Sequence, residues 1–347
     1  MRGPSAAPRR ILVRIPTWVG DAVMATPVFR ALRAAHPDAE IVLEGRPALE
    51  GLLRGLGSFD AYLPDPASGV RATLARARRL RAGDFDWAVL LPDSPRAALG
   101  PFLAGIPRRV GYARDPLRRA LLTEALPTPR TRGARLPVPM TERYLRITRR
   151  LGCPDRGAGL ELAVDPAVAE RCEAQLRGLG LEPGRPRLLV TPGASFGASK
   201  LWPPEHFAAA CDGIARKLGL APVLAPGPGE VAIAERIAAT AQEPVPVFAD
   251  RSPDLEQLKA LVAGAALVLT NDTGPRHVAV ALDRPAIVLM GPTDPRHTAQ
   301  HLERQRVLRE EVECSPCQLK VCPIDHRCMT RLAPERAVDA AEELLVG

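Results

Sequence analysis

The chain has 347 residues, which is long enough for two domains with separate cores. Its composition, 46% hydrophobic and 25% charged residues, excludes a chain that is disordered throughout. The net charge of +8 favours an anionic partner. Aromatic residues make up only 4%, which argues against binding of single-stranded nucleic acid through base stacking. A phosphorylated glycolipid at a membrane surface fits this charge better.

The N-terminal segment carries no targeting signal that we recognise. The apolar stretch Ile11 to Ile15 is interrupted by Arg14 and ended by Pro16, so it is too short for a signal peptide. No apolar run approaches the ~18 residues that cross a bilayer. We therefore expect a cytoplasmic protein.

The first half of the chain alternates strand-like and helix-like segments. Strands are expected at 11–15, 41–43 and 87–91, and helices at 21–35, 141–151 and 166–179. This alternation predicts right-handed βαβ units and a parallel sheet. A further helix carries an arginine cluster that we expect to lie on a solvated face: Arg76, Arg78, Arg79 and Arg81.

The segment 127–139 interrupts this pattern. It is rich in Pro, Arg and Thr and lacks periodicity, which predicts a mobile loop of the kind that is frequently functional. Its arginines, Arg130, Arg132 and Arg135, are candidate contacts for a phosphate or carboxylate of an acceptor. The same composition suits a plain solvated loop.

The second half restarts the alternation after a linker expected at 180–186. Its predicted strands lie at 187–190, 222–225, 245–248, 267–270 and 286–290. We therefore predict an α/β protein with two doubly wound parallel-sheet domains, residues 1–180 and 181–332, and a C-terminal helix within 333–347. Sheets of this kind bind ligands at the carboxyl ends of their strands, and a cleft between the domains would hold them.

The turn after the strand at 267–270 is the strongest candidate for a ligand site. Asp272 and Thr273 come directly after this buried strand. The N–H groups of Thr273 and Gly274 would begin the next helix and attract an anion such as a diphosphate. A plain helix cap is the alternative, because Asp, Asn and Thr are all favoured caps.

Other strand ends carry further candidates. Asp21 follows the first strand and begins a helix at its carboxyl end, where a plain N-cap is the alternative to a functional carboxylate. Lys200 follows the turn at 191–195, and a lysine suits the charge of a departing diphosphate, whereas a solvated surface lysine is the common alternative. Glu230 lies in a Pro- and Gly-rich loop after a strand in the second half.

The cysteines form one cluster and three scattered positions. The cluster, in a loop at 314–328 beside His326, has the spacing C-x2-C-x4-C-x5-C and consists of Cys314, Cys317, Cys322 and Cys328. Four thiolates at this spacing suit structural zinc or an iron–sulfur centre, and free or transiently paired thiols are the alternative. The scattered cysteines are expected in the core: Cys153, Cys172 and Cys211.

Three of these segments resemble the motifs of one family, glycosyltransferase family 9, the lipopolysaccharide heptosyltransferases. The turn at 270–277, with the Gly-Pro-Thr at 291–293, resembles the family's nucleotide-sugar segment. The segment 15–27 resembles its amino-terminal signature, and 192–203 resembles its Pro-Gly-Ala, Lys and Trp-Pro pattern. The resemblance extends from Ile11 to the final helix.

The resemblance implies a GT-B fold, in which two Rossmann-like domains face a central cleft, and an inverting transfer without a catalytic cofactor. No Asp-x-Asp pair lies in a turn suited to a metal-dependent GT-A enzyme. The implied donor is ADP-heptose, and the implied acceptor is the lipid A-core glycolipid at the inner membrane. The Trp-Val-Gly-Asp at 18–21 and the segment 140–144 favour the second-heptose branch, heptosyltransferase II. We expect a monomer in peripheral contact with that membrane.

The resemblance also implies residue roles. Asp21 would be the general base, and Lys200 with the N–H groups of Thr273 and Gly274 would stabilise the leaving ADP. Donor contacts are expected from Ser195, Glu230, Asp272 and His277. Two alternatives stay open: a family member with another nucleotide sugar or acceptor, and a non-catalytic nucleotide-sugar-binding module.

Overall fold

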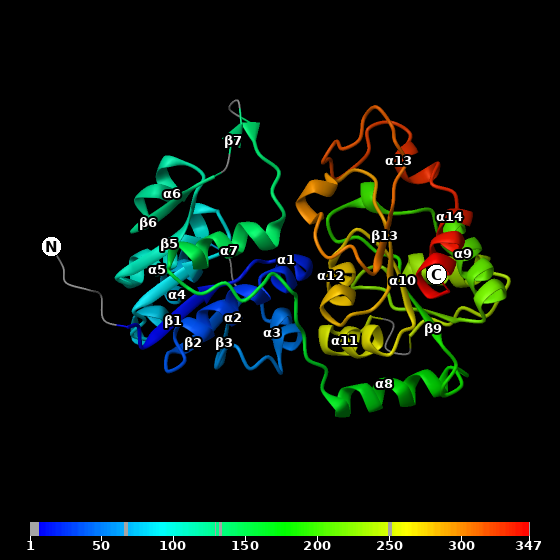
Figure 1. The fold of residues 1–347 in the computed structure, drawn as a ribbon, viewed down its shortest axis with the longest axis horizontal. Coiled ribbons are helices and arrows are strands. Elements are labelled where there is room, and N and C mark those ends of the chain that lie inside the picture. The colour runs from blue at the N-terminus through cyan, green and yellow to red at the C-terminus, as the bar shows by residue number, and fades with distance from the viewer. Residues whose placement is uncertain (1–6, 66–68, 129, 132–133, 249–251, 347) are drawn as a thin grey trace. The chain divides into compact units, whose positions relative to one another are not determined.

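The computed structural model describes residues 7–65, 69–128, 130–131, 134–248 and 252–346. The chain divides into two compact units, Met1–Glu161 and Leu162–Gly347 (Figure 1). The sequence predicts the boundary at residue 180, whereas this division follows Glu161, so the helix at 166–178 counts with the second unit. The linker at 180–186 lies within that unit.

The first unit is built on a parallel sheet. Its strands, in sheet order, are β3 (Ala61–Pro64), β2 (Glu40–Gly45), β1 (Arg10–Arg14), β4 (Trp87–Leu90), β5 (Arg108–Ala113) and β6 (Glu124–Pro127). This is the 3-2-1-4-5-6 order of the Rossmann fold. The order reverses between β1 and β4, and ligands bind at the carboxyl ends of strands at such a point.

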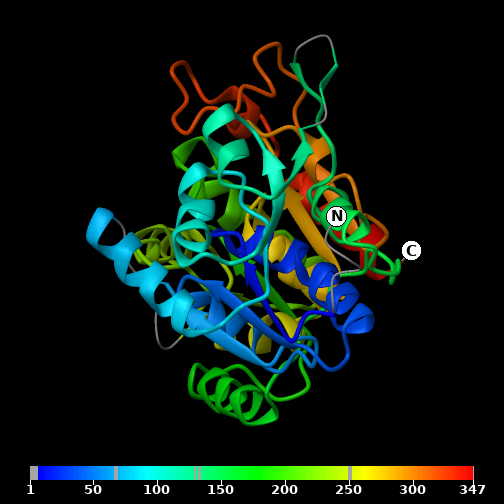
Figure 2. The same ribbon diagram turned by 90° about the vertical axis from the view of Figure 1, so that its left-hand side faces the viewer.

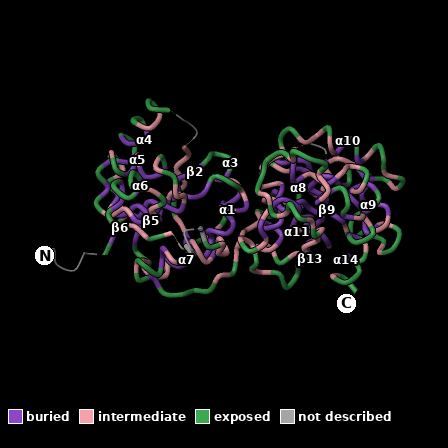
Figure 3. The backbone as a smooth tube through the Cα atoms, turned by 90° about the horizontal axis from the view of Figure 1, so that it is seen from above, coloured by how far each residue is buried: buried purple, intermediate pink, exposed green. Residues whose placement is uncertain are grey.

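Helices cover both faces of this sheet. One group consists of α1 (Val19–Met24), α2 (Thr26–Ala35), α3 (Ala48–Leu53) and α7 (Met140–Arg150). The other consists of α4 (Val70–Ala82), α5 (Pro95–Ala104) and α6 (Pro116–Ala120), and α4 lies alongside α5 (Figure 2). Because both faces are covered, the centre of β1 is apolar, and Ile11, Leu12 and Val13 are fully buried. Figure 3 shows buried residues, in purple, in the interior of this unit.

The prediction for Arg76 is wrong. This residue of α4 is 5% exposed, and its Nε and Nη2 donate to the Oε1 and Oε2 of the buried Glu44 at 2.6 and 2.5 Å. The guanidinium has room because Gly100 of α5 has no side chain there. Pairing with Glu44 lets this arginine be buried, which composition alone does not predict.

The second unit is built on a second parallel sheet. Its strands, in sheet order, are β10 (Ala221–Leu224), β9 (Arg187–Thr191), β11 (Leu267–Asn271), β12 (Ala286–Leu289) and β13 (Gln305–Leu308). The order reverses between β9 and β11. The strand predicted at 245–248 is only an isolated bridge between Leu224 and Val247, because Pro246 has no N–H to extend the ladder.

Helices again form two groups. On one face α9 (Pro204–Leu218), α10 (Val231–Thr240) and α14 (Glu335–Leu345) pack together, and α8 (Pro166–Gly178), α11 (Leu255–Ala263) and α12 (Gly274–Ala281) form the other group. Short turns of helix are η1 (Ala198–Lys200), η2 (Pro295–Thr298) and α13 (Arg327–Thr330). In the part of the chain that the structure describes, no helix is both long and apolar enough to cross a membrane.

Two doubly wound parallel sheets therefore confirm the predicted fold class. The segment predicted as a loop at 127–139 contains a small antiparallel pair, β7 (Arg130–Thr131) and β8 (Ala134–Arg135). Arg130 and Arg135 are register partners in this pair, whereas Arg132 lies outside the described residues.

Candidate active site

Asp272 is the centre of a buried polar cluster at the carboxyl edge of the second sheet. It follows β11 and is 7% exposed. Its Oδ2 accepts from Lys200 Nζ at 3.0 Å and from Thr293 Oγ1 at 2.7 Å, and its Oδ1 accepts from Arg276 Nη1 at 2.9 Å. The turns after β9, β11 and β12 therefore converge on one carboxylate.

Asp272 does not cap the following helix. The N-cap of α12 is Thr273, and no side-chain cap bond is made there. The carboxylate of Asp272 bonds instead to Lys200, Arg276 and Thr293. A cap is the alternative that local preference allows, whereas two partners of this carboxylate, Lys200 and Thr293, come from other turns of the sheet edge.

The charges of the cluster favour an anion. Burial opposes ionisation of Asp272, but the positive charges of Lys200 and Arg276 hold the pKa of its carboxyl well below the ordinary value. Two cations and one carboxylate (2 − 1) leave a net charge of +1. This charge lies at the start of α12, where first-turn N–H groups, such as those of Thr273 and Gly274, have no intrahelical partner.

His277 adds no charge to this cluster. The imidazole is buried, and burial, followed by the charge of Arg276, lowers its pKa to about 3. The side chain is therefore neutral at physiological pH. A neutral imidazole both donates and accepts a hydrogen bond, so His277 offers polarity without competing for the charge of Asp272.

Arg276 is a residue of the cluster that the sequence does not single out. It is 2% exposed, and besides Asp272 its guanidinium bonds to Gln305 Oε1 and Thr298 Oγ1, each at 2.9 Å, and to the Thr298 carbonyl at 3.2 Å. The available signal is its position four residues after Asp272, since an arginine in the first turn of a helix can reach back to a carboxylate just before that helix. Its other partners are distant in sequence.

The turn after β9 positions Lys200. The side chain is nearly buried, its Nζ also donates to the Asp272 carbonyl at 2.5 Å, and it lies 5.2 Å from the centre of the Phe196 ring. The turn is tied to β11 by Asn271, whose Nδ2 donates to the carbonyls of Pro192 at 2.6 Å and Gly193 at 3.2 Å. Lys200 is thus a fixed cation and not a solvated surface lysine.

Glu230 lies against the same turn. Its Oε2 accepts the Gly227 N–H at 2.7 Å, and a Cβ at Gly193 would lie 1.6 Å from its carboxyl. Burial raises the pKa of Glu230, and the N–H groups of Gly227 and Ala194 partly offset this. The structure therefore brings Glu230 beside the turn that carries Ser195, which is exposed.

Trp202 plays the packing role that the sequence predicts. It is 1% exposed, stacks edge-on against Phe207 of α9, and donates from Nε1 to the Leu332 carbonyl at 3.0 Å. Its burial fixes the chain immediately after Lys200. A ligand contact is not available to a side chain covered in this way.

In the first unit, Asp21 lies at the carboxyl end of β1. It is the third residue of α1, whose N-cap is Trp18, so Asp21 is not the helix N-cap. The hydroxyl of the buried Tyr144 lies 3.4 Å from its Oδ1. Burial, and next the charge of Asp21, raise the pKa of Tyr144 well above its ordinary value, so the phenol keeps its proton and donates to the carboxylate.

A second polar turn follows β4 on the other side of the same switch point. Asp93 accepts from Arg143 Nη2 at 2.9 Å, which ties the turn to α7. The fully buried Arg118 donates to the carbonyls of Ser94 at 2.6 Å and Pro92 at 2.8 Å. Burial lowers the pKa of Arg118 to about 10, still charged at neutral pH. The sequence marks this turn only as a strand end.

The clustered cysteines are close enough to influence one another. Burial, and next the neighbouring charges of Cys314, Cys322 and Cys317, raise the pKa of the Cys328 thiol to about 11. Within the described ranges, however, no three His, Cys, Asp or Glu side chains are gathered as a metal site requires, so the thiols as arranged do not fit zinc or an iron–sulfur centre. The three scattered cysteines are buried, as predicted.

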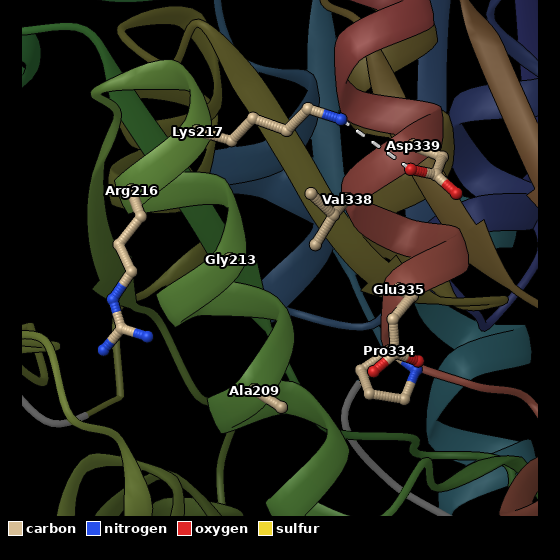
Figure 4. A pocket seen from close by; sticks show the side chains of 8 residues that line it. All are labelled: Ala209, Gly213, Arg216, Lys217, Pro334, Glu335, Val338 and Asp339. Atoms are coloured by element: carbon tan, nitrogen blue, oxygen red, sulfur yellow. Dashed lines mark ion pairs between the residues drawn. The ribbon is translucent and has the colours of Figure 1, made fainter.

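A separate hollow of about 450 Å³ lies between α9 and α14 (Figure 4). Gly213 and Val338 line it, and Lys217 at its rim lies 3.9 Å from Asp339. None of the predicted site residues belongs to it. We therefore place the candidate site at the strand ends and not in this hollow.

The chain is similar to known glycosyltransferases. The model of "Glycosyltransferase family 9 (heptosyltransferase)" matches residues 73–327. Lipopolysaccharide heptosyltransferase 2 of Salmonella typhimurium is 31% identical to this chain over 286 residues, which cover 80% of this chain and 81% of the relative. The Escherichia coli protein of that name is 29% identical over 290 residues, which also cover 80% of this chain and 81% of the relative.

Solved structures show the same fold over almost the whole chain. The Escherichia coli ADP-heptose lipopolysaccharide heptosyltransferase II has a TM-score of 0.78 at 27% identity and covers 97% of this chain and 98% of its own. A family 9 glycosyltransferase from Veillonella parvula has a TM-score of 0.82 at 22% identity, with 97% of each chain covered. The fold class is therefore GT-B, as predicted, and the chain belongs to glycosyltransferase family 9.

Proposed function

We propose that this enzyme is an inverting heptosyltransferase that moves L-glycero-D-manno-heptose from ADP-heptose to the inner core of lipopolysaccharide. The observation that carries the proposal is the buried cluster of Lys200, Asp272 and Arg276, with its net charge of +1, at the start of α12. The names of its heptosyltransferase 2 relatives support the choice of donor and acceptor.

The donor is held through its diphosphate. Lys200 and the N–H groups of Thr273 and Gly274 stabilise the charge that develops as ADP leaves, so the transfer needs no catalytic cofactor. Asp272 fixes the direction of the Lys200 ammonium through their 3.0 Å ion pair. Ser195 contacts a phosphate, Glu230 accepts from the ribose, and His277 positions the donor as a neutral imidazole.

Asp21 acts as the general base on the acceptor hydroxyl. Tyr144 orients this carboxylate by donating to its Oδ1, and the carboxylate takes the proton of the acceptor hydroxyl. Arg130, Arg132 and Arg135 bind a phosphate or carboxylate of the acceptor. We place the enzyme in the cytoplasm as a monomer in peripheral contact with the inner membrane.

A structural role is proposed for the cysteine cluster. Zinc or an iron–sulfur centre at Cys314, Cys317, Cys322 and Cys328 requires these side chains to come closer together than they are in this structure. Elemental analysis of the purified protein tests it: less than about 0.1 metal per chain rules the centre out and leaves free thiols.

Transfer of heptose to a heptosylated core acceptor tests the whole proposal. The wild type turns over with ADP-heptose; Asp21→Ala lowers kcat by about 10²–10⁴ and Lys200→Ala by about 10²–10³. Lys217→Ala is the matched control, since that lysine is 43% exposed on α9.

Each part of the proposal has its own contrary result. Turnover only with another nucleotide sugar would change the donor but keep the proposed roles of Asp21 and Lys200. Unchanged turnover in Asp21→Ala removes the base assignment. Binding of ADP-heptose without transfer to any acceptor identifies a binding module instead of an enzyme.

A further inference from the structure

The Cys-rich segment, residues 314–328, lies against two of the turns that form the Asp272 cluster. In Figure 1 this segment is the orange-red loop that leads into α13. It contacts the turn that ends at Lys200 and also the turn at 291–293, which carries Thr293. Both turns supply a side chain to the same Asp272 oxygen.

The contacts with the Lys200 turn centre on Ser199. This residue is 2% exposed, its N–H donates to the Lys320 carbonyl at 3.1 Å, and its hydroxyl donates to the Leu319 carbonyl at 2.5 Å. Its own carbonyl lies 2.7 Å from His326 Nε2. All three polar groups of Ser199, the residue immediately before Lys200, are thus held by the Cys-rich segment.

Glycine is needed where the two segments meet. A Cβ at Gly197 would lie 2.3 Å from the Lys320 carbonyl oxygen, closer than non-bonded atoms approach. The backbone of the Cys-rich segment therefore packs directly on the turn. Such close backbone packing is what transmits a shift of one segment to the other.

The second turn is held in a similar way. The Gln318 N–H donates to the Pro292 carbonyl at 2.8 Å, and the Ser315 hydroxyl donates to the Gly291 carbonyl at 2.7 Å. These bonds fix the chain next to Thr293, whose hydroxyl donates to Asp272. One segment thus bridges the supports of Lys200 and Thr293.

His326 occupies an unusual backbone conformation for this contact. Its φ of +58° is in the left-handed region, which a residue with a side chain rarely adopts. Its N–H donates to Cys322 Sγ at 3.3 Å, which holds that conformation. Because a carbonyl only accepts, the ring carries its proton on Nε2 and donates to Ser199.

We propose that His326 is a positioning residue for Lys200, acting through the Ser199 carbonyl. The Nε2–H bond holds the turn at 197–200 against the Cys-rich segment, so that the Lys200 ammonium stays directed at Asp272 and at the incoming diphosphate. This inference rests on the proposed role of Lys200 in stabilising the leaving ADP. Misplacing a catalytic cation by about 1 Å costs on the order of 10²-fold in rate.

A double-mutant cycle tests the proposal. His326→Ala is expected to lower kcat by about 10–100-fold in the wild-type background and by less than about twofold in the Lys200→Met background. His326→Gln restores at least a third of the rate, because the Gln amide also donates to a carbonyl. Val321→Ala, at a 69% exposed position of the same segment, leaves the rate unchanged.

The outcomes separate this inference from the proposed function. An equal loss on His326→Ala in both backgrounds overturns the proposal and leaves Lys200 in its role. Wild-type turnover in Lys200→Met removes the role of Lys200 itself. If His326→Ala does not fold, the same cycle with His326→Phe, which keeps an aromatic ring but has no N–H to donate to the Ser199 carbonyl, decides between these results.

Discussion

Replacing His277 by Gln should flatten the dependence of stability on pH. The folded protein binds a proton at His277 only near pH 3, whereas the unfolded chain does so near pH 6.5. As pH falls below 6.5 the unfolded state is therefore protonated first, and stability is lost until pH falls through about 3. Each pH unit in this window costs about 1.4 kcal/mol.

The size of the effect follows from these two values. Between pH 7.5 and pH 5.0 the wild type should lose about 2 kcal/mol of its free energy of unfolding through His277, since 1.5 pH units lie below 6.5. The His277→Gln variant has no proton to take up there and should lose that much less. Urea denaturation of both proteins at the two pH values gives the comparison, with pH 7.5 as each protein's own reference.

A direct measurement checks the cause. The chain has six histidines, so the ring signals of a ¹³C-histidine sample can be assigned by difference with His277→Gln. The signal missing from the variant should stay at its neutral shift down to pH 5. If it titrates with a midpoint near 6.5, the imidazole is not buried beside Arg276, and His277 would add positive charge to the Asp272 cluster below that pH.

Three further substitutions test other parts of the site. Arg276→Met should lower the free energy of unfolding by about 3–5 kcal/mol, because it leaves Asp272 and Gln305 buried without this partner. The control Arg296→Met, at a 67% exposed position, should cost less than about 1 kcal/mol in the same urea titration. Equal small losses in the two variants would contradict the buried cluster. Tyr144→Phe should lower kcat about 3- to 10-fold at unchanged donor KM in the transfer assay, and a raised donor KM would contradict its link to Asp21. Gly193→Ala should raise the donor KM at least about 10-fold, because the added methyl group displaces Glu230. Gly159→Ala, with open space around it, should leave the donor KM unchanged. An unchanged donor KM in both variants would show that Glu230 does not bind the donor.

The fold was predictable because both sheets are parallel and covered on both faces. Strands of this kind are apolar along their whole length, as Ile11 to Val13 are, and they stand out between polar turns. The prediction of a strand at 245–248 is wrong, because Pro246 has no N–H to extend the ladder beyond one bridge. Strand ends then indicated where Asp21, Lys200 and Asp272 would lie.

The partners of these residues were not predictable in the same way. Arg276 bonds to Thr298 and Gln305, which come to it only through the order of β11, β12 and β13. Arg76 of α4 is similarly buried because it meets Glu44 of β2. A sequence shows that an arginine is present, whereas the sheet order decides whether a carboxylate meets it.

The same reasoning explains why the anion site contains a carboxylate at all. A buried ammonium alone is costly, because it loses its hydration without a partner. Asp272 pairs with Lys200 at 3.0 Å, and Arg276 in turn pairs with Asp272 at 2.9 Å, so each charge in the cluster has an opposite charge beside it. The surplus of one positive charge then lies at the start of α12, where the diphosphate of the proposed donor would add a negative charge. The carboxylate lowers the attraction for an anion, but it keeps two cations buried and fixed in direction, which a solvated lysine cannot provide.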